Sequence, residues 1–342
     1  MPKILFNKAV LSIVAFALIY HLIALGLIFS QYPNEDTAYT KKTANSGLDF
    51  SDILSAPSTA SLPDLQSWKT RDGATLYYRQ YLSTKLTNKT LVLLHGSGWH
   101  SQQFVDLASN IAKSGTANVI TPDLRGHGID PKTRGDISYI GQFEDDLADL
   151  FTDLKITASD KNLYLGGHSS GGGLVVRFAG GQYGKQAAGF ILLAPYLKYN
   201  APTTRANSGG WARPLTRRII GLSLLNQMGI TSLNALPVIQ FNFPQTVLNG
   251  PLGETATTQY SYRLNTSYAP RDEYETDLAA MKQPFLLIAG SDDEAFVADQ
   301  YEPVISAKTK SGQYRIIEGQ GHLGIVKDKR VFTAVNEWLI NN

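Results

Sequence analysis

The sequence predicts an α/β protein in which a mainly parallel central sheet is covered by helices on both faces. Two observations lead to this prediction. Short apolar runs, typical of buried strands, alternate along the chain with amphipathic segments of helical period. Turns rich in glycine follow several of these runs, at the strand ends where a parallel sheet presents its ligand site. With 342 residues the chain can bury a substantial core.

Residues 1–30 are predicted to form a transmembrane signal anchor. Lys3 and Lys8 precede residues 9–30, an uncharged apolar run that is long enough, as a helix, to cross a hydrocarbon core of about 30 Å. Because basic residues precede the run and acidic residues follow it, we expect the rest of the chain on the extracytoplasmic side. Removal of the segment as a signal peptide is the alternative, although the run exceeds the usual length of a signal-peptide core.

Residues 31–67 are polar and rich in Ser, Thr, Asn and Pro, which predicts a tether. The folded domain is expected to start near Trp68 and to span residues 68–342. Its first feature is a predicted hairpin turn at Asp72-Gly73.

The other elements are expected to alternate between strand and helix. Strands are predicted at residues 90–95, 118–123, 163–165, 189–194, 284–289 and 313–318. Helices are predicted at residues 103–113 and 142–154, after Ser169, and at residues 330–340.

The stretch between Ala194 and Pro284 is too long for a simple crossover between consecutive strands. It predicts a mostly helical cap at about residues 198–281. The first half of the cap has no acidic residue and carries a basic cluster, which consists of Arg205, Arg213, Arg217 and Arg218. This cluster could be a solvated face of the cap, or it could contact anionic headgroups or a negatively charged substrate.

The segment Gly167-His168-Ser169-Ser170-Gly171 is a G-x-S-x-G sequence between a predicted strand and a predicted helix. A serine on such a tight turn has a strained backbone that exposes its hydroxyl, and side chains at Gly167 and Gly171 would collide there. The following helix directs free N–H groups at the same place, where an oxyanion would form. The pattern predicts that Ser169 is a nucleophile; a glycine-rich turn without chemistry is the alternative.

Two further motifs, His95-Gly96-Ser97-Gly98 and Asp123-Leu124-Arg125-Gly126-His127-Gly128, precede the Ser169 turn. Together the three motifs resemble the α/β-hydrolase family, and most closely its monoacylglycerol-lipase and lysophospholipase branch, from Trp68 to the C-terminus. The resemblance implies the α/β-hydrolase fold. It also implies an oxyanion hole formed by the backbone N–H groups of Ser97 and Ser170, and structural roles for Asp123 and His127.

The family order of nucleophile, acid and base places the base after Ser169. Of the six histidines only His322 follows that serine, so His322 is the predicted base. The acid should lie in the stretch Gly290-Ser291-Asp292-Asp293-Glu294. The spacing usual in the family selects Asp293, with Asp292 as a competitor.

These residues predict a serine carboxylic-ester hydrolase, similar to an esterase or lipase, that works through an acyl-enzyme. We expect a small-molecule or lipid ester as substrate, of the monoacylglycerol or lysophospholipid type, and contact with the membrane through the N-terminal helix. No metal, organic cofactor or nucleic acid is expected. The chain has no cysteine, which excludes disulfides and thiolate metal sites.

Three alternatives remain on the same fold. An aminopeptidase of the S33 type needs carboxylates in the cap to hold the amine of its substrate, and the candidates are Glu254, Asp272, Glu273, Glu275 and Asp277. An acyltransferase would use the same triad as a hydrolase. A non-catalytic binding protein is less consistent with the sequence, because all three triad positions are filled. Dehalogenases and epoxide hydrolases of this fold are disfavoured, because they use an aspartate nucleophile.

Overall fold

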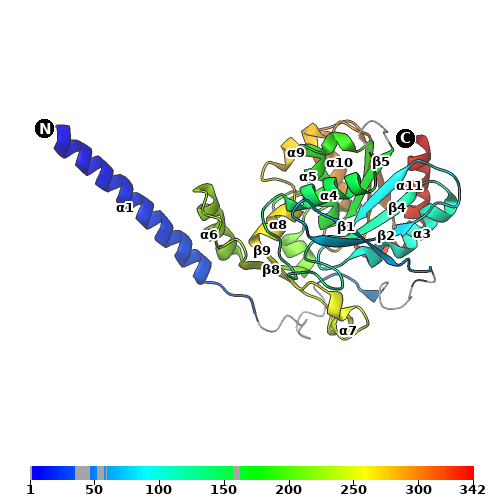
Figure 1. Cartoon of the computed structure of the whole chain (residues 1–342), viewed down its shortest axis with the longest axis horizontal. Helices are drawn as coiled ribbons and strands as arrows, with labels where there is room; N and C mark the ends of the chain where they lie inside the picture. The colour runs from blue at the N-terminus through cyan, green and yellow to red at the C-terminus, as the bar shows by residue number, and fades with distance from the viewer. Residues whose placement is uncertain (1, 35–46, 52–57, 59, 157–161) are drawn as a thin grey trace.

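The computed structural model describes residues 2–34, 47–51, 58, 60–156 and 162–342. Most of the predicted tether, including the acidic residues Glu35 and Asp36, lies outside these ranges. The described chain consists of a long helix, α1 (Pro2–Phe29), that projects from a compact α/β body (Figure 1).

The body is built on an eight-stranded sheet with the order β1-β2-β4-β3-β5-β6-β10-β11. Its strands are β1 (Leu65–Lys69), β2 (Thr75–Tyr81), β3 (Thr90–Leu94), β4 (Asn118–Asp123), β5 (Leu163–His168), β6 (Gly189–Leu193), β10 (Phe285–Gly290) and β11 (Gly312–Ile317). Strand β2 pairs antiparallel with β1 and β4, and all the other pairs are parallel. Every residue of β5, β6 and β10 is buried, as expected for the centre of a parallel sheet. The predicted fold class is therefore confirmed.

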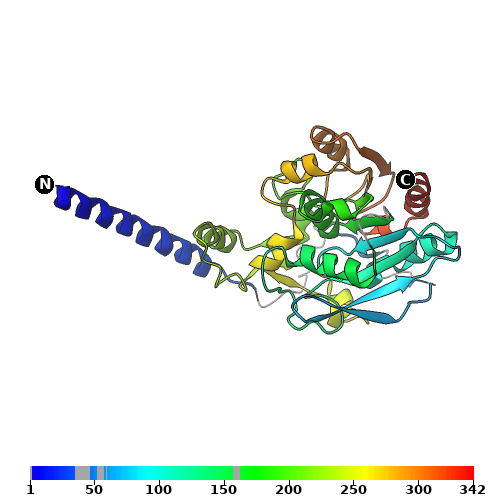
Figure 2. The same ribbon diagram turned by 45° about the horizontal axis from the view of Figure 1, so that its top comes forward.

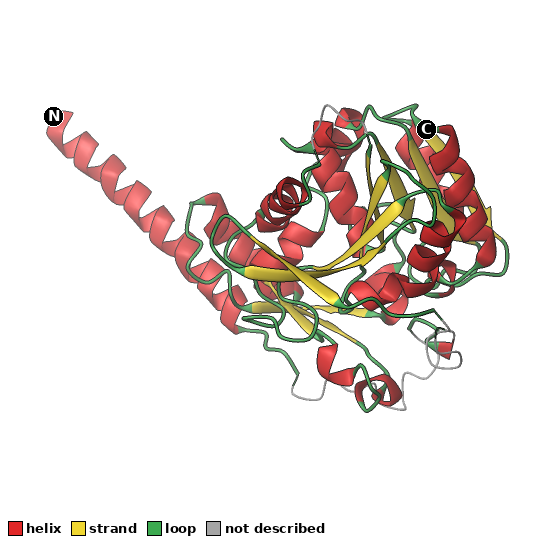
Figure 3. Cartoon of the chain, turned by 45° about the vertical axis from the view of Figure 1, so that its right-hand side comes forward, coloured by secondary structure: helices red, strands yellow, loops and turns green. Residues whose placement is uncertain are grey.

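Helices lie on both sides of this sheet (Figure 3). They are α3 (Val105–Ser114), α4 (Gln142–Asp153), α5 (Ser170–Gly180), α8 (Tyr262–Tyr268), α9 (Tyr274–Ala280), α10 (Tyr301–Ser306) and α11 (Lys329–Asn341). Helix α11 packs on α3, whereas α8 and α9 pack on α5. The two amphipathic helices predicted before the Ser169 turn correspond to α3 and α4.

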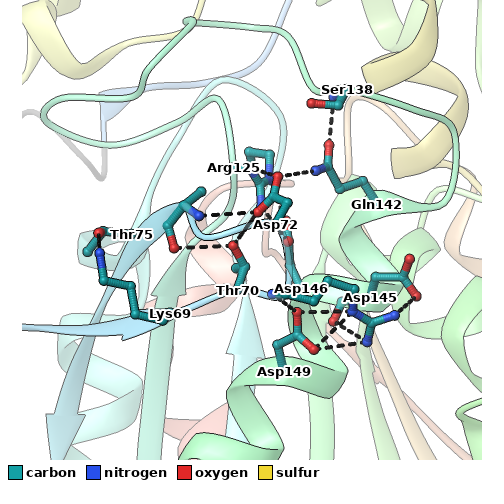
Figure 4. Close-up of polar contacts among 12 residues, drawn as sticks. Lys69, Thr70, Asp72, Thr75, Arg125, Ser138, Gln142, Asp145, Asp146 and Asp149 are labelled. Atoms are coloured by element: carbon teal, nitrogen blue, oxygen red, sulfur yellow. Dashed lines mark hydrogen bonds and ion pairs between the residues drawn. The ribbon is translucent and has the colours of Figure 1, made fainter.

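A polar network fixes the predicted hairpin between β1 and β2 to the rest of the body (Figure 4). Asp72, in the hairpin turn, accepts hydrogen bonds at 3.1 Å from Arg125 and from Gln142. Arg125 also pairs with Asp146 of α4 through two bonds of 2.7 and 2.8 Å. The network thereby holds the loop after β4, which carries His127, against α4.

The cap contains a three-stranded antiparallel sheet that the sequence did not predict. The strands of this sheet are β7 (Ala212–Pro214), β8 (Pro237–Phe241) and β9 (Gln259–Ser261), and the cap also contains the helices α6 (Thr216–Gln227) and α7 (Gln245–Leu248). Strands β7 and β9 have three residues each, which is too short to display a period of two and explains why these two escaped detection. Helices α8 and α9, expected in the cap, instead contact α5 of the body.

Three residues of the basic cluster of the cap, Arg205, Arg213 and Arg217, are exposed, as a solvated face requires, whereas Arg218 is buried. Arg205 donates from Nε to the backbone carbonyl of Asp293 at 3.1 Å. Arg217 and Arg218 both donate to backbone carbonyls at the C-terminal end of α1. The side chains of Arg205, Arg217 and Arg218 each satisfy backbone carbonyls.

Helix α1 contains Val10–Phe29, which among the described residues is the one stretch long and apolar enough to cross a membrane. A signal sequence near an N-terminus can meet the same criteria of length and composition. Its N-terminal part extends into open space, and its C-terminal part lies beside α6 (Figures 1 and 2).

Candidate active site

Ser169 occupies the turn between β5 and α5 in a strained conformation. Its backbone angles are φ 55° and ψ −122°, a region that residues other than glycine rarely adopt. The strained backbone predicted from the G-x-S-x-G sequence is therefore confirmed. The turn places Ser169 at the N-terminus of α5, where helix N–H groups lack partners within the helix.

The glycines on either side of Ser169 are required by close backbone contacts. A Cβ atom on Gly171 would lie 2.1 Å from the carbonyl oxygen of Leu94, and one on Gly167 would lie 2.4 Å from the backbone of Gly171. Neither neighbour is a flexible side chain that could move away. The collision predicted for these two positions is therefore confirmed.

His322 and Asp293 meet at the ends of the adjacent parallel strands β10 and β11. Nδ1 of His322 lies 2.8 Å from Oδ2 of Asp293, and both residues are almost fully buried. The other carboxylate oxygen of Asp293 accepts two backbone N–H bonds of 2.8 Å, which fix its orientation. Asp292, in contrast, is exposed and accepts a bond from Ser291. The structure thus places Asp293, rather than Asp292, against the histidine.

Glu294 is a residue of this site to which sequence reasoning gave no role. Its Oε2 accepts the backbone N–H of His322 at 2.8 Å, and its Oε1 accepts the backbone N–H of Asp49 at 3.0 Å. One carboxylate therefore connects the loop that carries His322 to the segment that precedes the body. The only sequence signal was its position next to Asp293.

His168 also supports the loop of His322. Its Nε2 lies 2.9 Å from the carbonyl oxygen of His322, and its Nδ1 lies 2.9 Å from Nε2 of Gln103. Burial, together with the neighbouring His322, lowers the pKa of His168 well below its ordinary value, so the ring stays neutral. The neutral ring then accepts from Gln103 and donates to the carbonyl. Since Gln103 also accepts the N–H of Gly96 at 2.7 Å, these side chains connect the turn after β3 to the histidine loop.

The two residues predicted to form an oxyanion hole lie side by side. Oγ of Ser97 is 2.5 Å from Oγ of Ser170. The N–H groups that flank Ser97 are occupied, because Gly96 donates to a side-chain amide and Gly98 donates to the hydroxyl of Tyr260. Within the described part of the chain, the backbone N–H groups of Ser97 and Ser170 have no acceptor. Both donors are therefore free to bind an oxyanion.

His127 contacts the turn after β3 through Tyr260. Its Nε2 lies 2.7 Å from the hydroxyl of Tyr260, the same hydroxyl that accepts the N–H of Gly98 at 2.6 Å. Its Nδ1 donates to the carbonyl of Arg125 at 3.1 Å, so Nε2 accepts from the tyrosine. Burial lowers the pKa of His127 to about 3. These contacts agree with the structural role that the family resemblance implies for this histidine.

The depressed pKa of His127 predicts a loss of stability in acid. In the unfolded chain a histidine titrates near pH 6.5, so between about pH 6.5 and 3 the unfolded state binds the additional proton. This residue should therefore lower the free energy of unfolding by about 1.4 kcal/mol for each pH unit below 6.5. Urea denaturation at pH 7.5, 6 and 5 should show a shallower pH dependence in His127→Gln than in the wild type. Equal pH dependences would contradict the assignment.

Phe50, in the segment that precedes the body, inserts between the cap and the turn after β3. It is 4% exposed, and its ring centroid lies 6.3 Å from that of Trp99, 5.7 Å from that of Trp211 and 6.1 Å from that of Phe243. Trp99 follows the predicted oxyanion turn, whereas the other two rings belong to the cap. Part of the predicted tether is thus packed beside the candidate site.

Replacing Phe50 by alanine should lower the free energy of unfolding by about 3 kcal/mol or more, because it leaves a cavity among these aromatic rings. Leu62→Ala, at an exposed position before β1, is the control and should change stability by less than about 0.5 kcal/mol. Urea denaturation followed by tryptophan fluorescence measures both variants. Equal stabilities would mean that Phe50 does not stay packed in solution.

No group of three or more His, Asp or Glu side chains suited to a metal ion occurs in the part of the chain that the structure describes. A cavity of about 570 Å³ lies beside the loop after β4, between β2 and the Arg263–Asp136 ion pair. Ser169 and His322 are not among its lining residues, so this cavity is separate from the candidate triad.

Comparisons with known sequences agree with this geometry. A profile of the family described as serine aminopeptidase, S33, matches residues 86–329. Human monoglyceride lipase is 24% identical over 295 residues, covering 83% of this chain and 92% of the lipase. Proline iminopeptidase of Lactobacillus helveticus is 23% identical over 304 residues, covering 78% of this chain and 95% of the peptidase. Local matches to uncharacterized proteins of Dictyostelium discoideum (30% identity) and Mycobacterium tuberculosis (32%) cover 38% and 30% of this chain, and only 13% and 28% of those proteins.

Solved structures show the same fold. A soluble variant of monoglyceride lipase from Saccharomyces cerevisiae superposes with a TM-score of 0.64 at 17% identity, covering 84% of this chain and 97% of that chain. A membrane phospholipase A, described as a bacterial virulence factor, has a TM-score of 0.57 at 20% identity and covers 100% of both chains. The family profile spans most of the sequence and the sheet has the expected topology. The chain therefore belongs to the serine aminopeptidase S33 family of α/β-hydrolases.

Proposed function

We propose that this protein is a serine carboxylic-ester hydrolase with Ser169 as nucleophile, His322 as general base and Asp293 as the acid that orients the base. The observation that carries the proposal is the 2.8 Å contact between His322 and Asp293, at the same sheet edge as the strained Ser169. A serine, a histidine and an aspartate in this arrangement can act as nucleophile, base and orienting group.

The proposed reaction has two halves. The hydroxyl oxygen of Ser169 attacks the ester carbonyl carbon while its proton passes to Nε2 of His322, and Asp293 stabilises the imidazolium through Nδ1–H. The N–H groups of Ser97 and Ser170 bind the developing oxyanion. The C–O bond to the alcohol then breaks, and the alcohol leaves with the proton from His322. Water attacks the acyl-serine by the same route and releases the acid.

Lipid-like acyl esters are the proposed substrate class. The relatives that the chain resembles along most of its length include a monoglyceride lipase, and its structural relatives include a membrane phospholipase. The aromatic side chains of Trp99, Trp211 and Phe243 form a buried apolar cluster next to the turn that carries Ser97. Anchoring by α1, with the body on the extracytoplasmic side, would place the enzyme beside such substrates.

An aminopeptidase is the second candidate, because of the family profile and the proline iminopeptidase relative. The position of Asp277, one of the candidate carboxylates of the cap, argues against it. Asp277 pairs with Arg271 at 2.6 Å and lies beside Gly180, the last residue of α5. Since α5 has 11 residues and rises about 16 Å, Asp277 lies at the far end of the helix from Ser169. Glu254, Asp272 and Glu273 are exposed.

A substrate panel tests the proposal with the full-length protein in detergent micelles. The panel contains a monoacylglycerol, a lysophosphatidylcholine and a proline p-nitroanilide, each assayed with the wild type and Ser169→Ala. We expect hydrolysis of at least one ester by the wild type and no hydrolysis by the variant. Faster cleavage of the prolyl anilide than of either ester would overturn the ester assignment in favour of the peptidase. Addition of an acceptor alcohol to the ester assay separates acyl transfer from hydrolysis.

A further inference from the structure

Helix α6 of the cap lies alongside the C-terminal half of α1 (Figure 1) and runs antiparallel to it. At the start of α6, Arg217 donates to the carbonyl of Ser30, just beyond α1. At the end of α6, Gln227 accepts a 3.2 Å bond from the hydroxyl of Tyr20. Helix α6 therefore extends back along the apolar stretch Val10–Phe29.

The two helices are in close contact at Gly221. A Cβ atom at this position would lie 2.5 Å from the carbonyl oxygen of Ala24 and 2.7 Å from Cγ1 of Ile28. Ala24 and Ile28 of α1 are fully buried, and they pack with Leu222 and Leu225 of α6 in one apolar cluster. Small residues at a helix crossing are typical of helices that pack within lipid, where close approach rather than apolar burial stabilises the pair.

Several polar side chains in the described part of this helix pair are bonded within it. The hydroxyl of Tyr20 bonds to Gln227, and Nδ1 of His21 lies 2.7 Å from the carbonyl oxygen of Ala17. In the turn after α6, the side-chain amides of Asn226 and Asn234 exchange two bonds of 2.7 and 2.8 Å. A polar group without a partner is costly in the hydrocarbon region, so internal pairing makes this segment compatible with lipid.

From Ile219 onward the segment is uncharged, and its exposed residues are apolar ones and small or neutral polar ones. Residues 219–253 contain no charged side chain. Ile220 and Met228 are 46% and 38% exposed. Charged and aromatic groups lie at the N-terminal end of α6, where the guanidinium carbon of Arg218 lies 5.1 Å from the ring centroid of Tyr32. Arginine and tyrosine at the point where an apolar helix ends are typical of the membrane interface.

We propose that α6 and the turn that follows it are a second membrane element, inserted beside α1 in the leaflet that the C-terminal half of α1 occupies. The partner of this surface is a lipid bilayer. The inference rests on the proposed anchoring by α1 and adds that the cap itself enters the membrane. The cap, whose aromatic rings lie beside the candidate site, is then in direct contact with the leaflet that would hold a lipid ester.

Single-cysteine variants test the proposal, because the natural chain has no cysteine. Full-length protein with an NBD label at Ile220→Cys, Met228→Cys, Phe16→Cys or Leu86→Cys is reconstituted in phosphatidylcholine vesicles, with and without doxyl-labelled lipid. Phe16 lies on α1 and Leu86 is fully exposed on the body. We expect doxyl lipid to quench the labels at positions 220 and 228 as it quenches the label at position 16, and to leave the label at position 86 unaffected.

The outcomes separate the two proposals. Quenching at position 16 without quenching at positions 220 and 228 overturns the insertion of α6 and leaves anchoring by α1 intact. Absence of quenching at position 16 overturns both. As a second test, Gly221→Leu should push α6 away from α1 and reduce quenching at position 228, with position 16 unchanged. Gly26→Leu is the matched control, because nothing lies within 4 Å of a Cβ there, and it should leave quenching at position 228 unaltered.

Discussion

Replacement of Ser169 by alanine is expected to lower kcat for ester hydrolysis by about 10⁶-fold, the loss typical of removing the nucleophile of a serine hydrolase. The substitution should leave the fold intact, because it removes only the hydroxyl oxygen and the surroundings hold the strained backbone. Ser169 donates its backbone N–H to the carbonyl of Leu193, and its own carbonyl accepts the N–H of Tyr196. Steady-state kinetics on the best ester of the panel measures the loss, and circular dichroism checks the fold.

Ser170→Ala is the matched control in the adjacent position. It removes a hydroxyl that contacts the hydroxyl of Ser97, but it keeps the backbone N–H proposed for the oxyanion hole. Its loss of activity should therefore stay below the roughly 10²-fold cost of removing an oxyanion donor. Retained activity in Ser169→Ala together with its loss in Ser170→Ala would move the nucleophile by one residue and refute the assignment.

The second large effect is expected at the acid. Asp293→Asn should lower kcat by about 10⁴-fold, because an amide cannot stabilise the imidazolium of His322 and favours the wrong tautomer. The amide oxygen can still accept the N–H groups of Ala295 and Phe296, so the loop should keep its conformation. The loss should be measured in kcat across pH 6 to 9, with substrate binding followed separately through KM.

Asp292→Asn provides the comparison that the sequence itself offers. Asp292 is exposed and bonded to Ser291, so its substitution should change kcat by less than about tenfold, far below the 10⁴-fold loss of a triad acid. If Asp292→Asn were the damaging variant and Asp293→Asn were nearly normal, the contact between Asp293 and His322 would not be the catalytic one.

The features that the sequence could predict are those encoded in short local patterns. The apolar runs that form β3, β4, β5, β6 and β10 are recognisable because parallel strands buried on both faces are continuous in hydrophobicity. The strained turn at Ser169 was predictable because Gly167 and Gly171 are needed at fixed distances from it. The Asp72-Gly73 hairpin turn follows from local turn chemistry in the same way.

Features that depend on contacts between distant segments could not be predicted. Gln103, His168 and Glu294 became part of the site only when the fold placed them against the loop of His322. The sequence left Asp292 and Asp293 open as the acid, since a shift of one residue changes which side chain faces the histidine. These choices depend on tertiary geometry, which one sequence does not contain.

The roles of several polar residues in the cap and the N-terminal helix likewise depend on tertiary contacts. Tyr20 and His21 are unexpected in an apolar run until the partners of their polar atoms are known, one on α6 and one on α1 itself. Arg218 belongs to a basic cluster in the sequence, yet it is buried and binds a carbonyl at the end of α1. Burial and pairing, rather than residue type, decide what these side chains do.

Covalent labelling of the full-length protein with a fluorophosphonate probe tests the central claim most directly, because only an activated serine reacts readily with such a probe. We expect a single adduct, located on Ser169 by peptide mass spectrometry, that is absent from Ser169→Ala and from His322→Ala. An adduct on another serine, or no adduct on the folded wild-type protein, would contradict the account.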